Sequence, residues 1–262
     1  MTIELDNPDF WNDRADYRGL VHDFTSFYSE RAWSLADVPH GAKVLDIAAG
    51  AGALALVAAR AGANVLATDF SSAMVEAIWA HELPNLRAEV MDGHALGIPD
   101  ASFEAAFSMF GIMLFADWRT GLAEMSRVLH PGGIACVGTW KEPPGAAANL
   151  LLAEMVARRF PDMEQPMPVT GMNALRDPAR FCAAFEEVGI GDVTIHEVSS
   201  DFVIESEVSL EPDRLFQFSP VWPLLDADQR ATILADMRNL AGRNGGVIRV
   251  ASPALIGIGR RQ

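Results

Sequence analysis

VLDIAAGAGALAL, at residues 44–56, is the stretch of this 262-residue chain that decides the fold. It predicts a short apolar strand near 43–47, a loop of small residues, and an alanine-rich helix near 52–61. Gly50 and Gly52 carry no Cβ, so a ligand can approach the backbone closely there. The amides at the start of the helix favour a carboxylate or a phosphate. The stretch therefore predicts a nucleotide-like ligand, although GAGALA also fits the dinucleotide-binding pattern of oxidoreductases.

Strand and helix patterns alternate after this stretch. The expected strands lie near 43–47, 64–69, 86–91, 103–109 and 133–140, and the helices between them near 52–61, 71–82 and 117–129. Turn signals separate them at Gly62, Pro84-Asn85, Pro99-Asp100 and Pro131-Gly132-Gly133. This order predicts an α/β fold with right-handed crossovers and a parallel sheet. Further helices are expected within 15–37 and 211–242 and near 146–159 and 178–188, with strands near 192–204 and 247–260.

An aspartate stands at or near the end of each of the first three expected strands. These are Asp46, Asp69 and Asp92. Ligands of open parallel sheets bind at the carboxyl ends of the strands. A carboxylate there can accept both hydroxyls of a ribose, or the exocyclic amine of a base. A single such aspartate is more often a helix cap or a turn residue, but three in register favour a ligand site.

The composition restricts the class of protein. The formal net charge of −15 disfavours binding to nucleic acid. The two cysteines, Cys136 and Cys182, have no metal-site spacing and form no disulfide framework, so we expect a reducing cytoplasm and no metal. No apolar run reaches the length of a membrane span, and the first residues lack the pattern of a signal peptide.

Four motifs together resemble the class I S-adenosylmethionine-dependent methyltransferases, within them the ubiquinone/menaquinone-biosynthesis type that acts on small molecules. They are VLDIAAGAG, then ATDFS followed by Met74, then MDGHALGIPDASFEAAFSMFGIMLFAD, then RVLHPGGIACVGTW. The resemblance implies a Rossmann-like methyltransferase fold: seven strands, mostly parallel with an antiparallel last strand, and helices on both faces. It also implies one domain over 1–262, with an N-terminal helical cap at 1–38, a cofactor-binding core at 39–142, and cap insertions at 143–177 and 205–246.

The resemblance also implies the cofactor, S-adenosylmethionine, with S-adenosylhomocysteine as product, and assigns its contacts by position. The methionine portion would lie at Asp46, Ala48 and Gly50, beside Gly52; the ribose at Asp69; the adenine at Phe70, Met74, Asp92 and the backbone of Gly93; and the sulfonium at Ser108 and Met109. Ala48 stands where the family has its first loop glycine, and an extended backbone there would tolerate the methyl group.

The expected reaction is in-line transfer of the methyl group to a small, partly apolar organic acceptor. Which atom receives the methyl group, and whether the protein is a monomer or a homodimer, stay open. Candidate bases in the N-terminal segment are His22, Tyr17 and Tyr28. Two alternatives remain. An NAD(P)-dependent oxidoreductase would place Asp46 unfavourably near a pyrophosphate, and a non-catalytic S-adenosylmethionine-binding protein would show no turnover.

Overall fold

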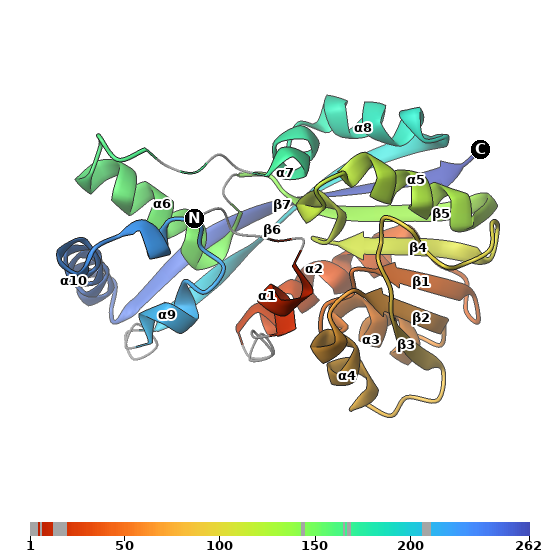
Figure 1. Cartoon of the computed structure of the whole chain (residues 1–262), viewed down its shortest axis with the longest axis horizontal. Helices are drawn as coiled ribbons and strands as arrows, with labels where there is room; N and C mark the ends of the chain where they lie inside the picture. The colour runs from red at the N-terminus through yellow and green to blue at the C-terminus, as the bar shows by residue number, and fades with distance from the viewer. Residues whose placement is uncertain are drawn as a thin grey trace. The chain divides into compact units, whose positions relative to one another are not determined.

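The computed structural model describes residue 5 and residues 7–12, 20–142, 145–164, 166, 169–205 and 211–262 (Figure 1). The chain divides into two compact units. The larger comprises Glu4–Lys141, Val169–Val198 and Ala254–Gln262, and the smaller comprises Met1–Ile3, Glu142–Pro168 and Ser199–Pro253. The larger unit contains the core expected over 39–142 except for Glu142.

One sheet of seven strands organises the fold. Its strands are β1 (Lys43–Ile47), β2 (Asn64–Asp69), β3 (Leu86–Val90), β4 (Phe103–Met109), β5 (Leu129–Trp140), β6 (Ile190–Glu205) and β7 (Val247–Arg261), in the order β3-β2-β1-β4-β5-β7-β6. Neighbouring strands from β3 to β5 run parallel, and β7 runs antiparallel to β5. The expected mostly parallel sheet with an antiparallel last strand is confirmed.

The strand order reverses at β1. β1 pairs with β2 on one side, where Asp46 is opposite Ala67, and with β4 on the other, where Asp46 is opposite Phe107. The loops that leave β1 and β4 therefore diverge to opposite sides and open a crevice at the carboxyl end of the sheet. The topology thus places a ligand site just beyond Asp46.

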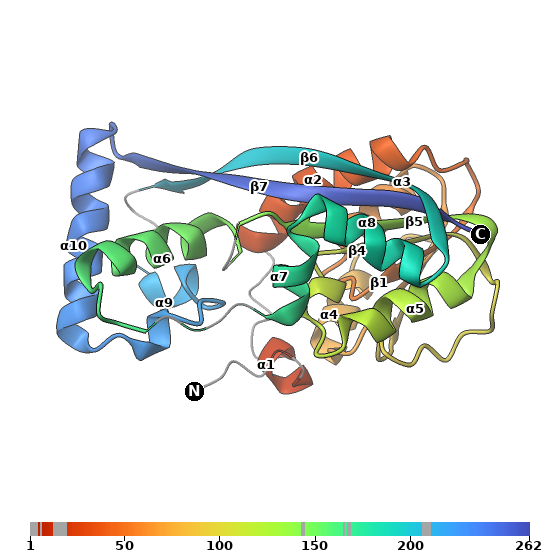
Figure 2. The ribbon, with the colours of Figure 1, turned by 90° about the horizontal axis from the view of Figure 1, so that it is seen from above.

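Helices cover both faces of the sheet within the larger unit. α2 (Leu20–Ala36), α3 (Ala53–Arg60) and α4 (Ser72–Trp79) contribute to one buried cluster together with strand residues such as Val44 and Ile256. The next residue along β7, Gly257, faces the opposite way, because a Cβ built there would lie 2.8 Å from Phe181 of α8 (Pro178–Glu187). Figure 2 shows α2 and α3 on one side of β5 and β7, with α5 (Trp118–Val128) and α8 on the other.

The smaller unit is mainly helical. It holds α6 (Ala147–Arg159), α9 (Pro212–Leu215), a 3-10 turn at Trp222–Leu224, and α10 (Ala227–Arg243). α10 begins with a capping box between Asp226 and Gln229, and the Arg159 guanidinium binds both oxygens of Asp236 at 2.6 Å. The helices expected within the two insertions are present. Residues 169–177, however, belong to the larger unit and form α7 (Thr170–Leu175).

Two boundaries and two helices differ from the sequence expectation. β5 begins at Leu129 rather than near 133, because Leu129 still pairs with Phe103 of β4. Pro131-Gly132-Gly133 form a bulge in β5, where Gly132 has φ +79° and the register with β4 shifts between Phe103 and Ala105. α4 ends at Trp79, three residues early. α1 (Pro8–Asn12) and α7 were not predicted, since five and six residues are too few to show a helical period.

No helix in the described part of the chain combines the length and the apolar character needed to span a membrane.

Candidate functional site

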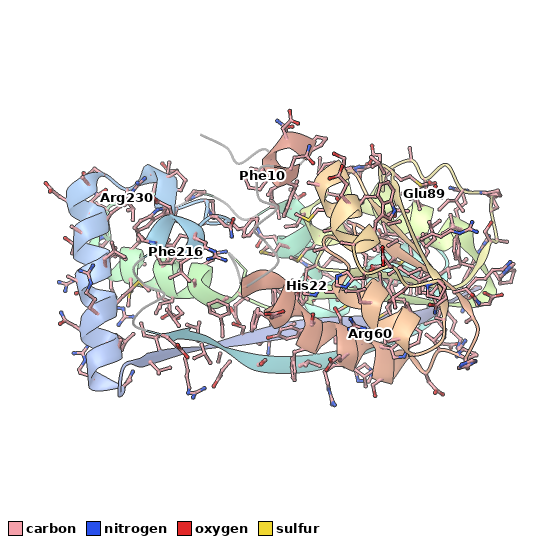
Figure 3. The ribbon with its side chains drawn as sticks, turned by 90° about the horizontal axis from the view of Figure 1, so that it is seen from below. Phe10, His22, Arg60, Glu89, Phe216 and Arg230 are labelled. Atoms are coloured by element: carbon pink, nitrogen blue, oxygen red, sulfur yellow. The ribbon has the colours of Figure 1, made fainter. Side chains whose placement is uncertain are left out.

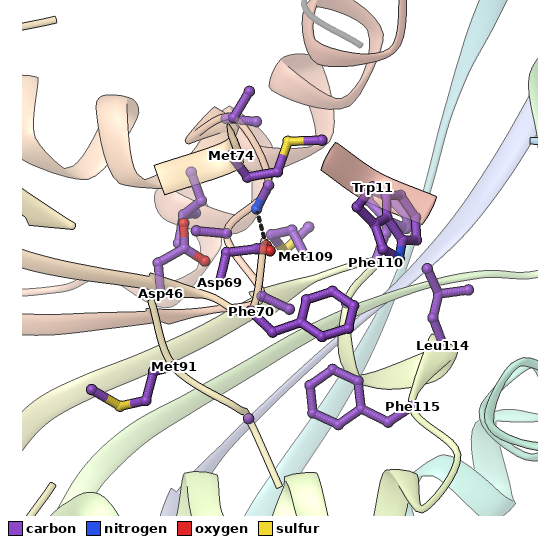
Figure 4. Close-up of a pocket in the computed structure, with 18 of the residues that line it drawn as sticks. Trp11, Asp46, Asp69, Phe70, Met74, Met91, Met109, Phe110, Leu114 and Phe115 are labelled. Carbon is purple, nitrogen blue, oxygen red and sulfur yellow. Dashed lines mark hydrogen bonds between the residues drawn. The ribbon is translucent and has the colours of Figure 1, made fainter. Parts of the chain in front are cut away.

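A cavity of about 340 Å³ opens at the carboxyl ends of β1, β2 and β4, within the larger unit (Figure 4). Its lining residues are Leu5, Trp11, Thr25, Ser29, Asp46, Ala48, Ala49, Gly50, Ala51, Ala53, Leu54, Asp69, Phe70, Met74, Met91, Asp92, Gly93, His94, Met109, Phe110, Gly111, Leu114, Phe115 and Ala116. The three aspartates predicted from the strand ends all line it. The cavity therefore lies where the strand-end pattern predicts a ligand site.

Asp46 forms the buried floor of the cavity. Its side chain is 1% exposed, and Oδ2 accepts a hydrogen bond of 3.0 Å from the amide of Ala55 in the first turn of α3. Burial raises the pKa of Asp46 to about 8, with the Ala55 hydrogen bond opposing this rise and the charge of Asp69 adding to it. A cationic ligand group nearby would restore the ionised form, so the floor suits an ammonium or sulfonium.

The loop after β1 uses left-handed backbone at three positions. Ala48, Gly50 and Gly52 have φ of +54°, +54° and +88°. The extended backbone that would tolerate the methyl group of Ala48 is not present: the alanine adopts a conformation that glycine occupies more readily. Gly52 does not line the cavity, and a Cβ there would lie 3.0 Å from Ile78 Cγ1. Glycine is therefore needed at position 52 for the left-handed turn and for the packing against α4. Gly50, in contrast, lines the cavity.

Asp69 joins this loop to the end of β2. Its side chain is buried, Oδ2 accepts from the amide of Gly50 and Oδ1 from the amide of Ser71, both at 2.9 Å. Burial raises the pKa of Asp69 to about 6, and these backbone hydrogen bonds limit the rise. Since a carboxylate has about four acceptor positions, both oxygens can still accept from ligand hydroxyls.

An apolar wall follows Asp69 along the chain. Phe70 and Met74 line the cavity, as expected, and so does Trp11 of the unpredicted helix α1. Asn12 Oδ1 anchors α1 to the start of α4 by accepting from Ser71 Oγ at 2.7 Å and from the Ala73 amide at 3.3 Å. The N-terminal segment thus contributes to the site through Trp11.

The loop after β3 brings Asp92, Gly93 and His94 to the cavity. Asp92 Oδ1 accepts from both the amide and Nδ1 of His94, each at 2.8 Å. Gly93 is required by packing, because a Cβ there would lie 2.5 Å from Cζ of Phe115. No pattern in the sequence points to Phe115, because its place depends on this tertiary contact.

The charges of the cavity favour one class of ligand over another. Among its lining residues on the described chain, the acidic side chains are Asp46, Asp69 and Asp92, and His94 is the other titratable group; none is lysine or arginine. A dinucleotide pyrophosphate would meet carboxylates and no cation there. The residues fit S-adenosylmethionine, which carries an ammonium, a sulfonium, a ribose and an adenine.

Comparison with known proteins agrees with this fit. A family model described as a methyltransferase domain matches residues 45–137. A demethylmenaquinone methyltransferase of Corynebacterium efficiens is 33% identical over 162 residues, 60% of this chain and 69% of that protein. One of Paenarthrobacter aurescens is 32% identical over 225 residues, 80% of this chain and 88% of that protein.

This chain belongs to the class I S-adenosylmethionine-dependent methyltransferases of the quinone-biosynthesis type. It catalyses methyl transfer from that cofactor to a small-molecule acceptor, so the NAD(P)-dependent oxidoreductase and the non-catalytic alternatives are set aside.

Solved structures share the fold of this methyltransferase. The YcgJ protein of Bacillus subtilis is 21% identical with a TM-score of 0.56, covering 90% of this chain and 99% of its own. Phosphoethanolamine N-methyltransferase 2 of Haemonchus contortus, solved with S-adenosylhomocysteine, is 16% identical with a TM-score of 0.53, covering 90% of this chain and 53% of its own. The expected Rossmann-like methyltransferase fold is confirmed.

Two residues at the end of β4 have different roles in this methyltransferase. Met109 lines the cavity, and Gly138 of β5 makes room for it, since a Cβ there would lie 2.5 Å from Met109 Cε. Ser108, expected beside the sulfonium, does not line the cavity. Its buried Oγ accepts from the Ile112 amide at 3.1 Å and so caps the 3-10 turn Ile112–Leu114.

The candidate bases do not gather at the cavity of the methyltransferase. His22 is not among the lining residues; it lies on α2, and Figure 3 shows it on the same side as Arg60. Burial lowers the pKa of His22. Tyr28 is fully buried, its ring packed edge to face against Phe110 and Trp140. Tyr17 lies outside the described residues. Thr25 and Ser29 are the α2 residues that line the cavity.

An arginine clamp holds the loop that carries Asp92. Arg127 of α5 donates to both oxygens of Glu124, at 2.7 and 2.8 Å, and to Asp100 Oδ1 at 2.7 Å. It also donates to the carbonyls of Ile98 and Leu96. The hydrogen bonds to Glu124 and Asp100 raise the pKa of Arg127 further above its usual range. The clamp therefore attaches the loop that follows Asp92 to α5.

Proposed function

We propose that this methyltransferase methylates the ring of a small quinol-type acceptor, and that the strand-end residues hold the cofactor. The acceptor class rests on the relatives, which are demethylmenaquinone methyltransferases. It agrees with the apolar lining that Met109, Phe110, Leu114 and Trp11 give the cavity. The single observation that carries the cofactor assignment is the set of three aspartates around the Gly50 loop, without lysine or arginine among the described lining residues.

Different residues of the cavity would bind different parts of the cofactor. Asp46 and Gly50 would hold the amino-acid portion of the cofactor, Asp69 the ribose hydroxyls, Phe70 and Met74 the adenine faces, and Asp92 with the Gly93 backbone the adenine edge. When bound, S-adenosylmethionine supplies a methyl group on a positively charged sulfur. Met109 and the apolar wall would keep water away and align the acceptor, which is where much of the rate enhancement of a displacement reaction arises. The structure gives no reason to place His22, Tyr28 or Ser108 in contact with the reacting atoms.

The cofactor assignment is tested by calorimetry with S-adenosylhomocysteine and NAD. We expect S-adenosylhomocysteine to bind and NAD not to bind. Asp69→Ala removes the acceptor of the ribose hydroxyls and the hydrogen bond to the Gly50 amide. Its binding free energy for S-adenosylhomocysteine should therefore weaken by roughly 2–4 kcal/mol. Glu89→Ala is the matched control, because Glu89 is an exposed carboxylate on β3 that does not line the cavity. Thermal melting of each variant separates lost affinity from lost folding.

Unchanged affinity in Asp69→Ala would contradict the ribose assignment. The acceptor class is tested separately, by following labelled methyl transfer to a short-chain demethylmenaquinol and to a small amine. Transfer to the amine alone would contradict the quinol proposal and leave the cofactor assignment intact.

We also propose a reducing cytoplasm as the compartment of this protein and a small molecule, not nucleic acid, as its partner. The reducing cytoplasm expected from the cysteines agrees with Cys136 being free and buried and Cys182 being free and partly buried. Nucleic acid is not proposed as a partner, because the net charge is −15.

A further inference from the structure

Asp92 is an exposed carboxylate on a loop, and such a group needs support to present one oxygen in one direction. Its side chain is 62% exposed. A freely rotating carboxylate would bind water as readily as a ligand amine, and it would discriminate weakly between bases. Selectivity at this edge of the cavity therefore requires something that fixes the Asp92 rotamer.

His94 supplies that support. Its amide and its Nδ1 both lie 2.8 Å from Oδ1 of Asp92. Since a carboxylate only accepts, Nδ1 carries the proton of this pair. Partial burial raises the pKa of Asp92, but the hydrogen bonds from the amide and ring of His94 outweigh it and lower the pKa overall. Oδ2 accepts no hydrogen bond from the residues that the structure describes.

The ring of His94 is itself held in place. It packs on the ring of Phe115, with centroids 4.6 Å apart and planes inclined by 34°. Phe115 is confined between two glycines, since a Cβ at Gly93 would lie 2.5 Å from Cζ and a Cβ at Gly121 would lie 2.7 Å from Cδ2. His94 and Phe115 both line the cavity, so the support belongs to the site.

We infer that His94 is a positioning residue that determines base specificity: it occupies Oδ1 of Asp92 and leaves Oδ2 to accept from the exocyclic amine of adenine. The inference rests on the proposed function, which places adenine at Asp92. It goes beyond it by naming the residue through which the chain tells a 6-amino purine from a 6-oxo purine. The 6-oxo purine has no amine to donate, and it would turn its carbonyl oxygen toward a fixed carboxylate.

The test measures affinity for S-adenosylhomocysteine and for its 6-oxo analogue, S-inosylhomocysteine, by calorimetry. We expect the unmodified protein to prefer the adenosyl ligand by roughly tenfold or more, the range for a hydrogen bond to a charged group. His94→Phe keeps an aromatic ring to stack on Phe115 and loses the Nδ1 donor. This variant should reduce the preference at least fivefold. His94→Asn loses the ring but can place its amide N–H near the position of Nδ1, and so should retain most of the preference.

Several results would overturn the inference. An unchanged preference in His94→Phe would do so, and so would an equal loss of affinity for both ligands, which indicates a structural role only. Loss of the preference in His94→Asn to the same extent as in His94→Phe would show that the donor is not the cause. Failure of the unmodified protein to bind S-adenosylhomocysteine would overturn the proposed function itself, and is distinguishable because no preference could then be measured in any variant.

Discussion

Gly111 is the position where adding one methyl group should disturb the cavity most directly. Its φ of −88° suits any residue, so an alanine there meets no backbone strain. The added Cβ would, however, lie 2.6 Å from Cβ of Ala48, 2.9 Å from Ser108 Oγ and 3.2 Å from the Ala48 carbonyl oxygen. Carbon atoms in contact normally stay 3.5–4.0 Å apart. The Ala48 methyl group cannot rotate away, because it is attached directly to the backbone.

Gly111→Ala should therefore destabilise the fold. Overpacking lowers the stability of the folded state by about 1–3 kcal/mol. Replacing glycine raises that stability by roughly 0.4–1 kcal/mol, because it restricts the unfolded chain. We expect a net loss of about 1–2 kcal/mol in the free energy of unfolding, with weaker binding of S-adenosylhomocysteine. Gly97→Ala is the matched control, because no atom lies within 4 Å of a Cβ built at Gly97.

Ala48→Gly completes a double-mutant cycle. Alanine at φ +54° costs about 1–2 kcal/mol relative to right-handed backbone, and the extra freedom of glycine when unfolded offsets part of the gain. Ala48→Gly alone should thus be neutral or stabilising by up to about 1 kcal/mol. In its background, Gly111→Ala no longer meets the 2.6 Å contact and should cost about 1 kcal/mol less. Urea unfolding of the four proteins measures this coupling, and additivity within about 0.5 kcal/mol would refute the packing argument.

Two other predictions concern charge. Asp46 has a folded pKa of about 8 against an ordinary value near 3.8, so the folded ligand-free protein keeps a proton that the unfolded chain releases. The free energy of unfolding of the unmodified protein should therefore fall as the pH rises from 6 to 8. The fall should be steeper than in Asp46→Asn by up to about 1.4 kcal/mol per pH unit. Urea unfolding measures both pH dependences, and equal ones would contradict the prediction. Arg127→Gln should lower the free energy of unfolding by about 1–3 kcal/mol and weaken S-adenosylhomocysteine binding, because it releases the Asp92 loop. Arg119→Gln is the control, because it removes only the exposed ion pair with Glu187, whose atoms lie 3.7 Å apart. It should change the free energy of unfolding and the affinity little. Similar losses in both variants would argue against the clamp.

The sheet was predictable because its signals are local. β1, β2 and β4 begin and end where apolar runs of five to seven residues meet turn residues, and Asp46, Asp69 and Asp92 follow from the strand ends. The cavity confirms that these three meet at one place. Met74 and Met109 also line it, as the resemblance implied.

What escaped prediction depends on contacts between distant segments. Ser108 does not line the cavity, whereas its neighbour Met109 does. Side chains alternate between the two faces along β4, and the sequence does not say which face the cavity takes. Phe115 and Trp11 reach the cavity through packing with residues tens of positions away. Ala48 adopts a left-handed backbone that alanine does not signal. Residue type and a place in the N-terminal segment predict His22 and Tyr28 as bases, but neither lines the cavity.

The attachment of Asn12 to Ser71 has a consequence for biosynthesis. On the ribosome, the segment that carries Trp11 emerges first, while the hydroxyl that anchors it emerges 59 residues later. At about 5–20 residues per second, that delay is roughly 3–12 s. Ala116, the last of the lining residues, comes later still, yet before β5 and β7 exist. The nascent chain therefore carries every lining residue before the sheet that supports them is complete. A ligand of the cavity present at that stage would therefore meet the lining residues before β5 and β7 exist.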